Sequence, residues 1–211
     1  MNPGAVVFLV DDDASCLRAT ARMLAAEGFP VSAFDSGAGV LAAVTPATRG
    51  CVVADLTMPG MDGLQLQAAL AQGGVLMPVL FLSGHGDIPS TVRAMQGGAI
   101  DFLEKHAPRE KLLAAIRGAL DRDAKESERR AAQSELRLRF DALTKRELEV
   151  LREVVRGQMN KQIAATLGIS ERTVKLHRTA IKSKIGVRSS ARLATLARDA
   201  DLFEGAPPAA R

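Results

Sequence analysis

The sequence predicts a doubly wound α/β domain followed by a smaller, separate all-helical domain. Over the first 120 of the 211 residues, five short apolar runs alternate with longer segments of helical spacing. A charged stretch without Gly or Pro comes next, and helical segments separated by Gly follow it. We therefore expect an α/β domain over residues 1–120, a helical linker over 121–140 and a helical domain over 141–200.

Each apolar run is expected to be a strand buried on both faces. Runs of four to six apolar residues, rich in β-branched side chains, fit the central strands of a parallel sheet. Strands that alternate with helices run parallel, so the pattern predicts a five-stranded parallel sheet with helices on both sides. The predicted strands are residues 5–10, 31–34, 51–54, 79–82 and 99–103.

Apolar residues three or four apart predict a helix after each strand. In the first of these segments Leu17, Ala21, Leu24 and Ala25 share one helical face. The other predicted helices are residues 36–44, 63–70, 88–96 and 109–120.

Residues 121–140 are predicted to continue the last of these helices as an exposed linker. Acidic and basic residues lie three or four apart, as Glu126 does from Arg129 and Arg130, and each such pair stabilises a helix by ~0.2–0.5 kcal/mol. The apolar positions are too sparse for a coiled coil.

Four further helical segments are predicted at residues 144–156, 160–167, 170–184 and 189–200. Thr144 and Glu147 have the spacing of a capping box at the start of the first. Gly168 and a new N-cap at Ser170 place a tight turn between the second and third, which is the helix-turn-helix pattern. Residues 201–211 have no periodicity and are expected to be disordered.

Composition excludes membrane, secreted and fibrous classes. The longest apolar run, residues 75–82, is far shorter than the ~20 residues of a membrane helix. The first residues lack the basic start of a signal peptide. Two cysteines, Cys16 and Cys51, are too few for a disulfide scaffold and are expected to be buried, reduced thiols of a cytoplasmic protein.

The charge is divided unevenly along the chain. Residues 1–120 hold 8 basic and 11 acidic residues, whereas residues 141–211 hold 14 and 8, within a total net charge of +4. An acidic first domain and a basic last domain indicate different partners, and a basic domain with a helix-turn-helix pattern is a candidate DNA binder.

Polar residues follow the predicted strands where each strand ends. Asp11, Asp12 and Asp13 follow the first strand, and Asp55, Ser83 and Lys105 follow the third, fourth and fifth. Open α/β sheets bind ligands at these carboxyl ends. Crowded carboxylates need a cation, and Mg²⁺ prefers such oxygen ligands, although Asp13 is also explained as the N-cap of the first helix.

Four motifs surround these strand ends: Val10-Asp11-Asp12-Asp13, Asp55-Leu56-Thr57-Met58-Pro59-Gly60-Met61-Asp62-Gly63, Ser83-Gly84-His85-Gly86-Asp87 and Asp101-Phe102-Leu103-Glu104-Lys105. Together they resemble the receiver domain of bacterial two-component response regulators, a flavodoxin-like fold, over roughly residues 5–120. The resemblance implies that a sensor histidine kinase phosphorylates Asp55. It further implies a site for Mg²⁺ (or Mn²⁺) formed by Asp11, Asp12, Asp55 and the Thr57 backbone carbonyl. The phosphoryl-binding and switch residues it implies are Ser83, Phe102 and Lys105.

Two positions depart from the receiver pattern. His106 stands where the family has a Pro that aims the Lys side chain through a cis peptide; a non-proline cis bond costs ~3–4 kcal/mol, so the Lys105–His106 bond is expected to be trans. Ser83 stands where Thr is common. The departure at His106 leaves an alternative open, namely a DNA-binding regulator whose receiver is inert or independent of phosphorylation.

The C-terminal domain has the residue types of a DNA reader. Its motifs, Asn160-Lys161-Gln162-Ile163-Ala164 and Thr173-Val174-Lys175-Leu176-His177, resemble the four-helix LuxR-type (GerE) DNA-binding domain over about residues 141–200. The resemblance implies base contacts in the major groove from Lys175, Leu176 and Thr179. The implied phosphate contacts are Lys161, Arg172, Thr173, Arg178 and Lys182. Helical spacing predicts an inward face of Val174, His177, Ile181 and Ile185, with a base contact as the alternative for His177. The side chains predicted to face solvent are Arg172, Lys175, Arg178, Thr179 and Lys182.

With both domains on one chain, the sequence resembles response regulators of the FixJ/NarL type. The resemblance implies that the protein is a phosphorylation-dependent transcription regulator and not an enzyme. A phosphohydrolase with an Asp nucleophile is disfavoured because Thr57 stands where such enzymes carry their second Asp. The implied partners are a sensor histidine kinase, double-stranded promoter DNA, a second copy of the chain on activation and, as a further candidate, RNA polymerase, with no membrane partner.

Overall fold

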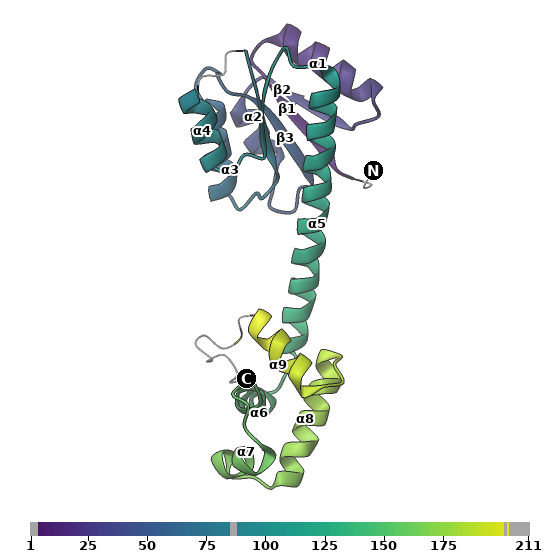
Figure 1. The fold of residues 1–211 in the computed structure, drawn as a ribbon, viewed down its shortest axis with the longest axis vertical. Coiled ribbons are helices and arrows are strands. Elements are labelled where there is room, and N and C mark those ends of the chain that lie inside the picture. Colours follow the sequence, from purple (N-terminus) through teal and green to yellow (C-terminus); the bar gives the residue numbers. More distant parts are fainter. Residues whose placement is uncertain (1–3, 85–87, 201, 203–211) are drawn as a thin grey trace. The chain divides into compact units, whose positions relative to one another are not determined.

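The computed structural model describes residues 4–84, 88–200 and 202. The chain divides into two compact units, Met1–Ser127 and Glu128–Arg211. The first is an α/β unit and the second is all-helical within the described residues, so the predicted fold class is confirmed (Figure 1). His85 and all of the predicted disordered tail except Leu202 lie outside the described residues.

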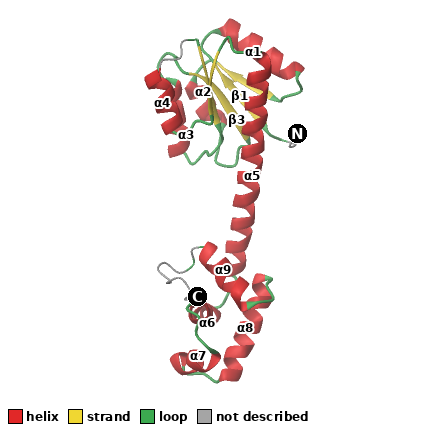
Figure 2. Ribbon diagram, in the orientation of Figure 1, coloured by secondary structure: helices red, strands yellow, loops and turns green. Residues whose placement is uncertain are grey.

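The first unit is built on a sheet of five parallel strands in the order β2-β1-β3-β4-β5. Figure 2 shows the strands of this sheet in yellow among red helices. The predicted strands all form, with ends that differ by one or two residues. The expectation that each is buried on both faces is wrong for β2 and β5, which lie at the edges of the sheet and are partly exposed. The order puts β1 and β3 side by side at the centre, with Val10 opposite Ala54, so the residues that follow these two strands are neighbours. The strands are β1 (Val6–Val10), β2 (Val31–Phe34), β3 (Gly50–Asp55), β4 (Val79–Ser83) and β5 (Asp101–Glu104).

Helices cover both faces of this sheet because alternate residues of each strand point to opposite sides. On one face α1 and α5 pack against Val7, Leu9 and Val53. On the other face α2, α3 and α4 pack against Phe8 and Phe81. The helices of this unit are α1 (Ala14–Ala26), α2 (Gly37–Ala43), α3 (Gly63–Gln72), α4 (Ile88–Gln96) and the first part of α5 (Arg109–Asp141).

Both cysteines are free. Cys51 lies buried in β3, where burial raises the pKa of its thiol to about 12. Cys16, which was expected to be buried, is only half-buried, because α1 places it at the edge of the sheet beside Asp11.

The long helix α5 is unbroken over 33 residues, which confirms the predicted helical linker. One acidic residue of this segment was wrongly expected to be exposed: Asp123 is only 2% exposed. Its Oδ2 accepts hydrogen bonds from Arg49 Nε at 2.9 Å and from the Gly50 amide at 3.1 Å, and Arg49 also contacts Ser127. These contacts fasten α5 to the start of β3 as far as Ser127.

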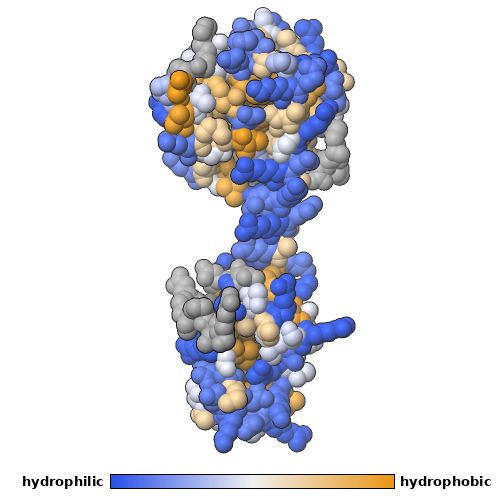
Figure 3. Space-filling view, viewed as in Figure 1, coloured by the Kyte–Doolittle hydropathy of each residue, from blue (hydrophilic) through white to orange (hydrophobic). Residues whose placement is uncertain are grey.

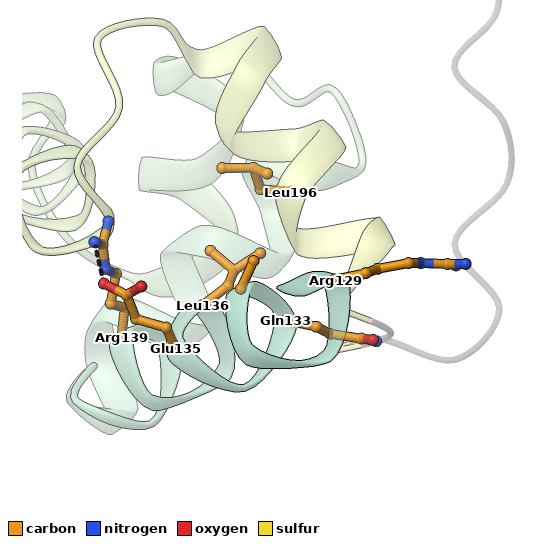
Figure 4. A pocket seen from close by; sticks show the side chains of 7 residues that line it. Arg129, Gln133, Glu135, Leu136, Arg139 and Leu196 are labelled. Atoms are coloured by element: carbon orange, nitrogen blue, oxygen red, sulfur yellow. Dashed lines mark hydrogen bonds and ion pairs between the residues drawn. The ribbon is translucent and has the colours of Figure 1, made fainter. Parts of the chain in front are cut away.

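The second unit packs four further helices around the end of α5. Its core includes Phe140 of α5 with Val150, Ile163 and Ile181, so the last turns of α5 belong to this unit. Figure 4 shows Leu136 of α5 and Leu196 of α9 at a groove between these two helices. The helices are α6 (Lys145–Val155), α7 (Asn160–Leu167), α8 (Glu171–Ile185) and α9 (Ser190–Asp199).

The local signals in the sequence explain the ends of these helices. Thr144 and Glu147 form the predicted capping box of α6, and the Ser170 side chain caps α8. Gly168, with φ of 63°, is the left-handed residue that ends α7 and allows the tight turn into α8. The helix-turn-helix pattern is confirmed as α7, this turn and α8.

Candidate functional site

Three carboxylates gather at the carboxyl ends of β1 and β3. Asp11 and Asp12 follow β1, Asp55 ends β3, and one oxygen atom of each lies within 4.8 Å of the others. Asp55 is 8% exposed and Asp11 is buried, whereas Asp12 is open to solvent. The group is therefore an acidic cluster in which two carboxylates are buried and Asp12 is open to solvent.

Lys105 brings a positive charge into this group. Its Nζ lies 2.8 Å from Asp55 Oδ2 and 2.7 Å from Asp11 Oδ2. Burial favours loss of its proton, but hydrogen bonds to Asp11 and Asp55 outweigh this and raise the pKa of Lys105 above its ordinary value. The Lys105–His106 bond is trans, as expected, since the described residues contain no cis peptide. Lys105 therefore reaches Asp55 without a cis bond after it.

The donor set of this cluster fits a hard divalent cation. Carboxylate and carbonyl oxygens are the ligands that Mg²⁺ and Mn²⁺ take in proteins, and three carboxylate oxygens converge here. Thr57 lies at the same edge, and its amide donates to Asp55 Oδ1 at 3.4 Å. These residues form a site consistent with divalent-metal binding.

Ser83 and Phe102 lie on the two strands beyond Asp55. Ser83 ends β4 and is buried, and its backbone oxygen accepts a hydrogen bond from the Lys105 amide at 2.8 Å. Phe102 of β5 is half-buried, with its ring centroid 6.3 Å from that of Phe81. A displacement of Ser83 would therefore shift the loop that carries Lys105, because the two residues are joined by this backbone hydrogen bond.

Two other polar residues near this edge take no part in the cluster. Asp13 caps α1, accepting hydrogen bonds from the amides of Ser15 and Cys16, which lower the pKa of its carboxyl. His106 is exposed and pairs with Glu104 at 2.9 Å, so it lies at the surface. The interpretation of Asp13 as a helix cap is confirmed.

An exposed polar face runs along α8. Arg172, Lys175 and Thr179 are exposed, and Leu176 among them keeps 64% of its surface open. Lys161 is exposed at the start of α7. An apolar side chain within a basic helical face is suited to a partner that offers both phosphates and methyl groups.

Three of the predicted phosphate-contact residues are less open than expected. Thr173 is half-buried, with its hydroxyl 2.8 Å from that of Ser170, and Lys182 is also half-buried. Arg178 departs most from the predicted solvent-facing position, because its guanidinium donates to Asn160 Oδ1 at 2.8 Å and to Ser190 Oγ at 2.9 Å. His177 is half-buried, in keeping with its predicted inward position.

Two cationic side chains hold the C-terminal end of α8, one from α5 and one from α8 itself. Arg139 of α5, paired with Glu135 in Figure 4, donates to the Ile185 carbonyl at 3.1 Å. Lys184 donates to the buried Glu147 carboxylate at 2.7 Å. Burial would raise the pKa of Glu147, but the hydrogen bonds from Lys184 and Thr144 outweigh it and lower that pKa.

Sequence reasoning missed the partners that hold these elements in place. Nothing in the pattern distinguished Asp123 from the other charged residues of the linker. Asn160 and Ser190 each begin a helix, but the spacing of residues within helices carries no information on which side chain of α8 meets them.

Comparison with known proteins defines the class. Residues 7–117 match the family described as the response regulator receiver domain, and residues 141–197 match the bacterial regulatory proteins of the luxR family. The α/β unit with its acidic cluster and the helix-turn-helix unit together make the chain a response regulator with a DNA-binding domain.

The relatives define the type more closely. Nodulation protein W of Bradyrhizobium diazoefficiens is 42% identical over 189 residues, which span 90% of this chain and 83% of that protein. The transcriptional regulatory protein FixJ of Azorhizobium caulinodans is 39% identical over 203 residues, 96% of this chain and 94% of that protein. The solved low-resolution structure of the response regulator StyR is 44% identical, with a TM-score of 0.83 over 93% of this chain and 99% of that one.

The chain belongs to the two-component response regulators of the FixJ type, in which a phosphoacceptor receiver precedes a LuxR-type DNA-binding domain. It is a transcription regulator and not an enzyme. The receiver implies a sensor kinase as partner, and the helix-turn-helix domain implies DNA binding. None of the described helices is long and apolar enough to span a membrane.

Proposed function

We propose that Asp55 accepts a phosphoryl group from the phosphohistidine of a sensor kinase. The observation that carries the proposal is the position of Lys105, whose ammonium lies 2.8 Å from Asp55 Oδ2. An Asp55 oxygen attacks phosphorus, the bond from phosphorus to the histidine nitrogen breaks, and that nitrogen keeps the electron pair. Lys105 compensates the negative charge on the phosphoryl oxygens during transfer.

A divalent cation, Mg²⁺ or Mn²⁺, is the cofactor proposed for this site. Asp11, Asp12, Asp55 and the Thr57 carbonyl would hold it, because their oxygens suit a hard cation. When bound, it supplies further neutralisation of the phosphoryl charge. Asp11 and Asp12 then act as positioning ligands, with Asp11 also orienting Lys105.

Ser83, Phe102 and Lys105 are the proposed switch residues. New phosphoryl oxygens on Asp55 attract the Ser83 hydroxyl and the Lys105 ammonium, both of which lie at the same edge of the sheet. Phe102 is half-buried beside β4, so its ring has a surface-facing alternative to its contact with Phe81. The switch would alter the surface of α4 and β5.

That surface is proposed to form the homodimer on activation. Ile88, Val92 and Met95 lie four and three residues apart on α4, and Ile88 keeps 80% of its surface exposed. Figure 3 shows the resulting apolar area over α4, in orange at the left edge. Exposed apolar side chains on one helical face are typical of an association surface.

The DNA-binding domain is proposed to read promoter DNA through α8. Lys175, Leu176 and Thr179 are the proposed base contacts in the major groove, since a Lys there prefers guanine and an apolar side chain suits a thymine methyl. Paired domains would bind half-sites roughly one helical turn apart. The proposed phosphate contacts are Lys161, Arg172, Thr173 and Lys182, with Arg178 treated separately below.

The organisation proposed from the sequence is a receiver over residues 1–120, a linker over 121–140 and a DNA-binding domain over 141–200. We propose that the protein acts in the cytoplasm, where its kinase partner and promoter DNA are accessible, and that bound dimers act on RNA polymerase.

Analytical ultracentrifugation with Mg²⁺ tests the phosphorylation switch. Addition of a small phosphodonor such as acetyl phosphate is expected to shift the wild-type protein from monomer to dimer, because phosphorylation alters the α4–β5 surface so that two copies pair. Chelation of the metal should prevent the shift. A wild-type protein that stays monomeric with phosphodonor and Mg²⁺ would favour the alternative of an inert receiver.

Lys175→Ala is expected to weaken DNA binding about 10-fold, because a base contact in the major groove is worth ~1–3 kcal/mol. The loss should be largest on the preferred duplex. Fluorescence anisotropy on a duplex selected from a random pool measures the loss, with Lys145→Ala as control, because Lys145 is an exposed lysine on α6. Unchanged affinity in Lys175→Ala would remove this residue from the proposed base contacts.

A further inference from the structure

Arg178 lies where three helices of the DNA-binding domain meet. It projects from the middle of α8, and its two terminal nitrogens donate to Asn160 Oδ1 at 2.8 Å and Ser190 Oγ at 2.9 Å. Asn160 is the first residue of α7 and Ser190 is the first residue of α9. One guanidinium therefore joins the start of two helices to the centre of the third.

Shape, and not charge, explains this contact. Both acceptors are neutral, and the N-terminal ends of helices carry partial positive charge, which does not favour a cation. The planar guanidinium can direct two N–H groups at two separate acceptors, and a lysine ammonium cannot reproduce this fork. Arg178 is also half-buried, unlike its neighbours Lys175 and Thr179 on the exposed face.

We propose that Arg178 is a positioning residue that sets the sequence specificity of DNA binding. The inference rests on the proposed function of α8 as the element that reads the major groove. By joining α8 to α7 and α9, Arg178 fixes the rotation and tilt with which Lys175 and Leu176 meet the base edges. It differs from a phosphate contact, which is the role the resemblance implied for it.

The two roles have different consequences for binding. Phosphate contacts contribute to every duplex alike, and loss of one reduces the dependence of log K on log[salt] by about 0.9. Base contacts require the helix to be held in one orientation, so loss of a positioning residue reduces affinity for the preferred sequence and leaves non-specific affinity in place.

The test compares Arg178→Lys and Arg178→Gln with wild type on two duplexes. One is the sequence that the wild-type protein selects from a random duplex pool, and the other is a mixed-sequence duplex of equal length. Fluorescence anisotropy across a salt series gives the affinity and the salt slope for each. Circular dichroism melting, with binding measured well below the transition, confirms that the compared proteins are folded.

For both variants we expect affinity for the selected duplex to fall about tenfold or more, with mixed-duplex affinity within about twofold and the salt slope unchanged. Arg178→Lys should not restore affinity for the selected duplex, although lysine keeps the positive charge. A uniform loss on both duplexes, a slope lower by about 0.9 in Arg178→Gln, and rescue by lysine would overturn the proposal in favour of a phosphate contact. Unchanged affinity on both duplexes would also overturn it.

A second variant keeps the charge of Arg178 and removes its acceptors. Asn160→Ala combined with Ser190→Ala should show the same selective loss on the preferred duplex, and should add little to Arg178→Gln in a double-mutant cycle. If the losses of affinity caused by the two sets of substitutions were fully additive, the proposed coupling of Arg178 to Asn160 and Ser190 would be contradicted. If wild-type protein treated with acetyl phosphate and Mg²⁺ selects no sequence from the pool, the proposed DNA-binding function itself fails, a result distinct from any difference among the variants.

Discussion

Asp55→Asn is expected to abolish phosphorylation. The amide that replaces the carboxylate has no nucleophilic oxygen of comparable strength. Incubation with radiolabelled acetyl phosphate and Mg²⁺ measures the incorporated phosphoryl group. The variant should also remain monomeric in the ultracentrifuge under conditions that dimerise wild type.

The substitution should not weaken the fold. It removes one of three carboxylates that lie within 4.8 Å of one another, so mutual repulsion falls, and the melting temperature should stay level or rise. Asp62→Asn is the matched control, because Asn serves as well as Asp as the N-cap of α3 and Asp62 lies outside the cluster. Phosphoryl incorporation at wild-type level in Asp55→Asn would mean that another residue is the acceptor.

Gly50→Ala is expected to unfold the receiver. Gly50 begins β3 with φ of +141°, a conformation that L-residues rarely adopt, and a Cβ there would lie 1.8 Å from the Val6 carbonyl oxygen. The obstacle is backbone of the paired strand β1, which cannot move without breaking the centre of the sheet. A loss of more than about 4 kcal/mol is expected, against a total stability of about 5–15 kcal/mol for a typical domain.

Urea unfolding followed by circular dichroism measures this loss. Gly118→Ala is the matched control, since Gly118 lies exposed within α5 with open space at its Cβ position. That change should stabilise the protein by about 0.5–1 kcal/mol, because Ala is the better helix former. A stability of Gly50→Ala within about 1 kcal/mol of wild type would contradict the backbone path described for the start of β3.

The architecture was predictable because it depends on local patterns. The apolar runs of the third and fourth strands end at Asp55 and Ser83. Because parallel strands place their carboxyl ends at the same edge of the sheet, the polar residues there come together whatever the detailed packing. The proximity of Asp11, Asp12 and Asp55 could therefore be expected from strand ends alone. The helix-turn-helix could be predicted from N-cap residues and glycines, because these residues determine where helices begin and end within a few positions of themselves.

The contacts between elements far apart in sequence could not be predicted in this way. Asp123 is buried by the start of β3, 73 residues earlier, whereas Asp121 and Arg122 just before it are charged and exposed. Arg178 was assigned to solvent because helical spacing gives the direction of a side chain and not the neighbour that it meets. The aim of Lys105 is a similar case, since its contacts with Asp11 and Asp55 depend on where the loop after β5 lies.

The hydrogen bonds that Asp123 accepts from Arg49 and the Gly50 amide have a consequence for protein engineering. A chimera that joins this receiver to a foreign output domain at residue 120 would discard Asp123 and Ser127, leaving the half-buried Arg49 guanidinium and the Gly50 amide without these acceptors. A splice after Ser127 keeps them. The receiver segment that can be transferred intact thus ends about three helical turns beyond residue 117, where the receiver family match stops.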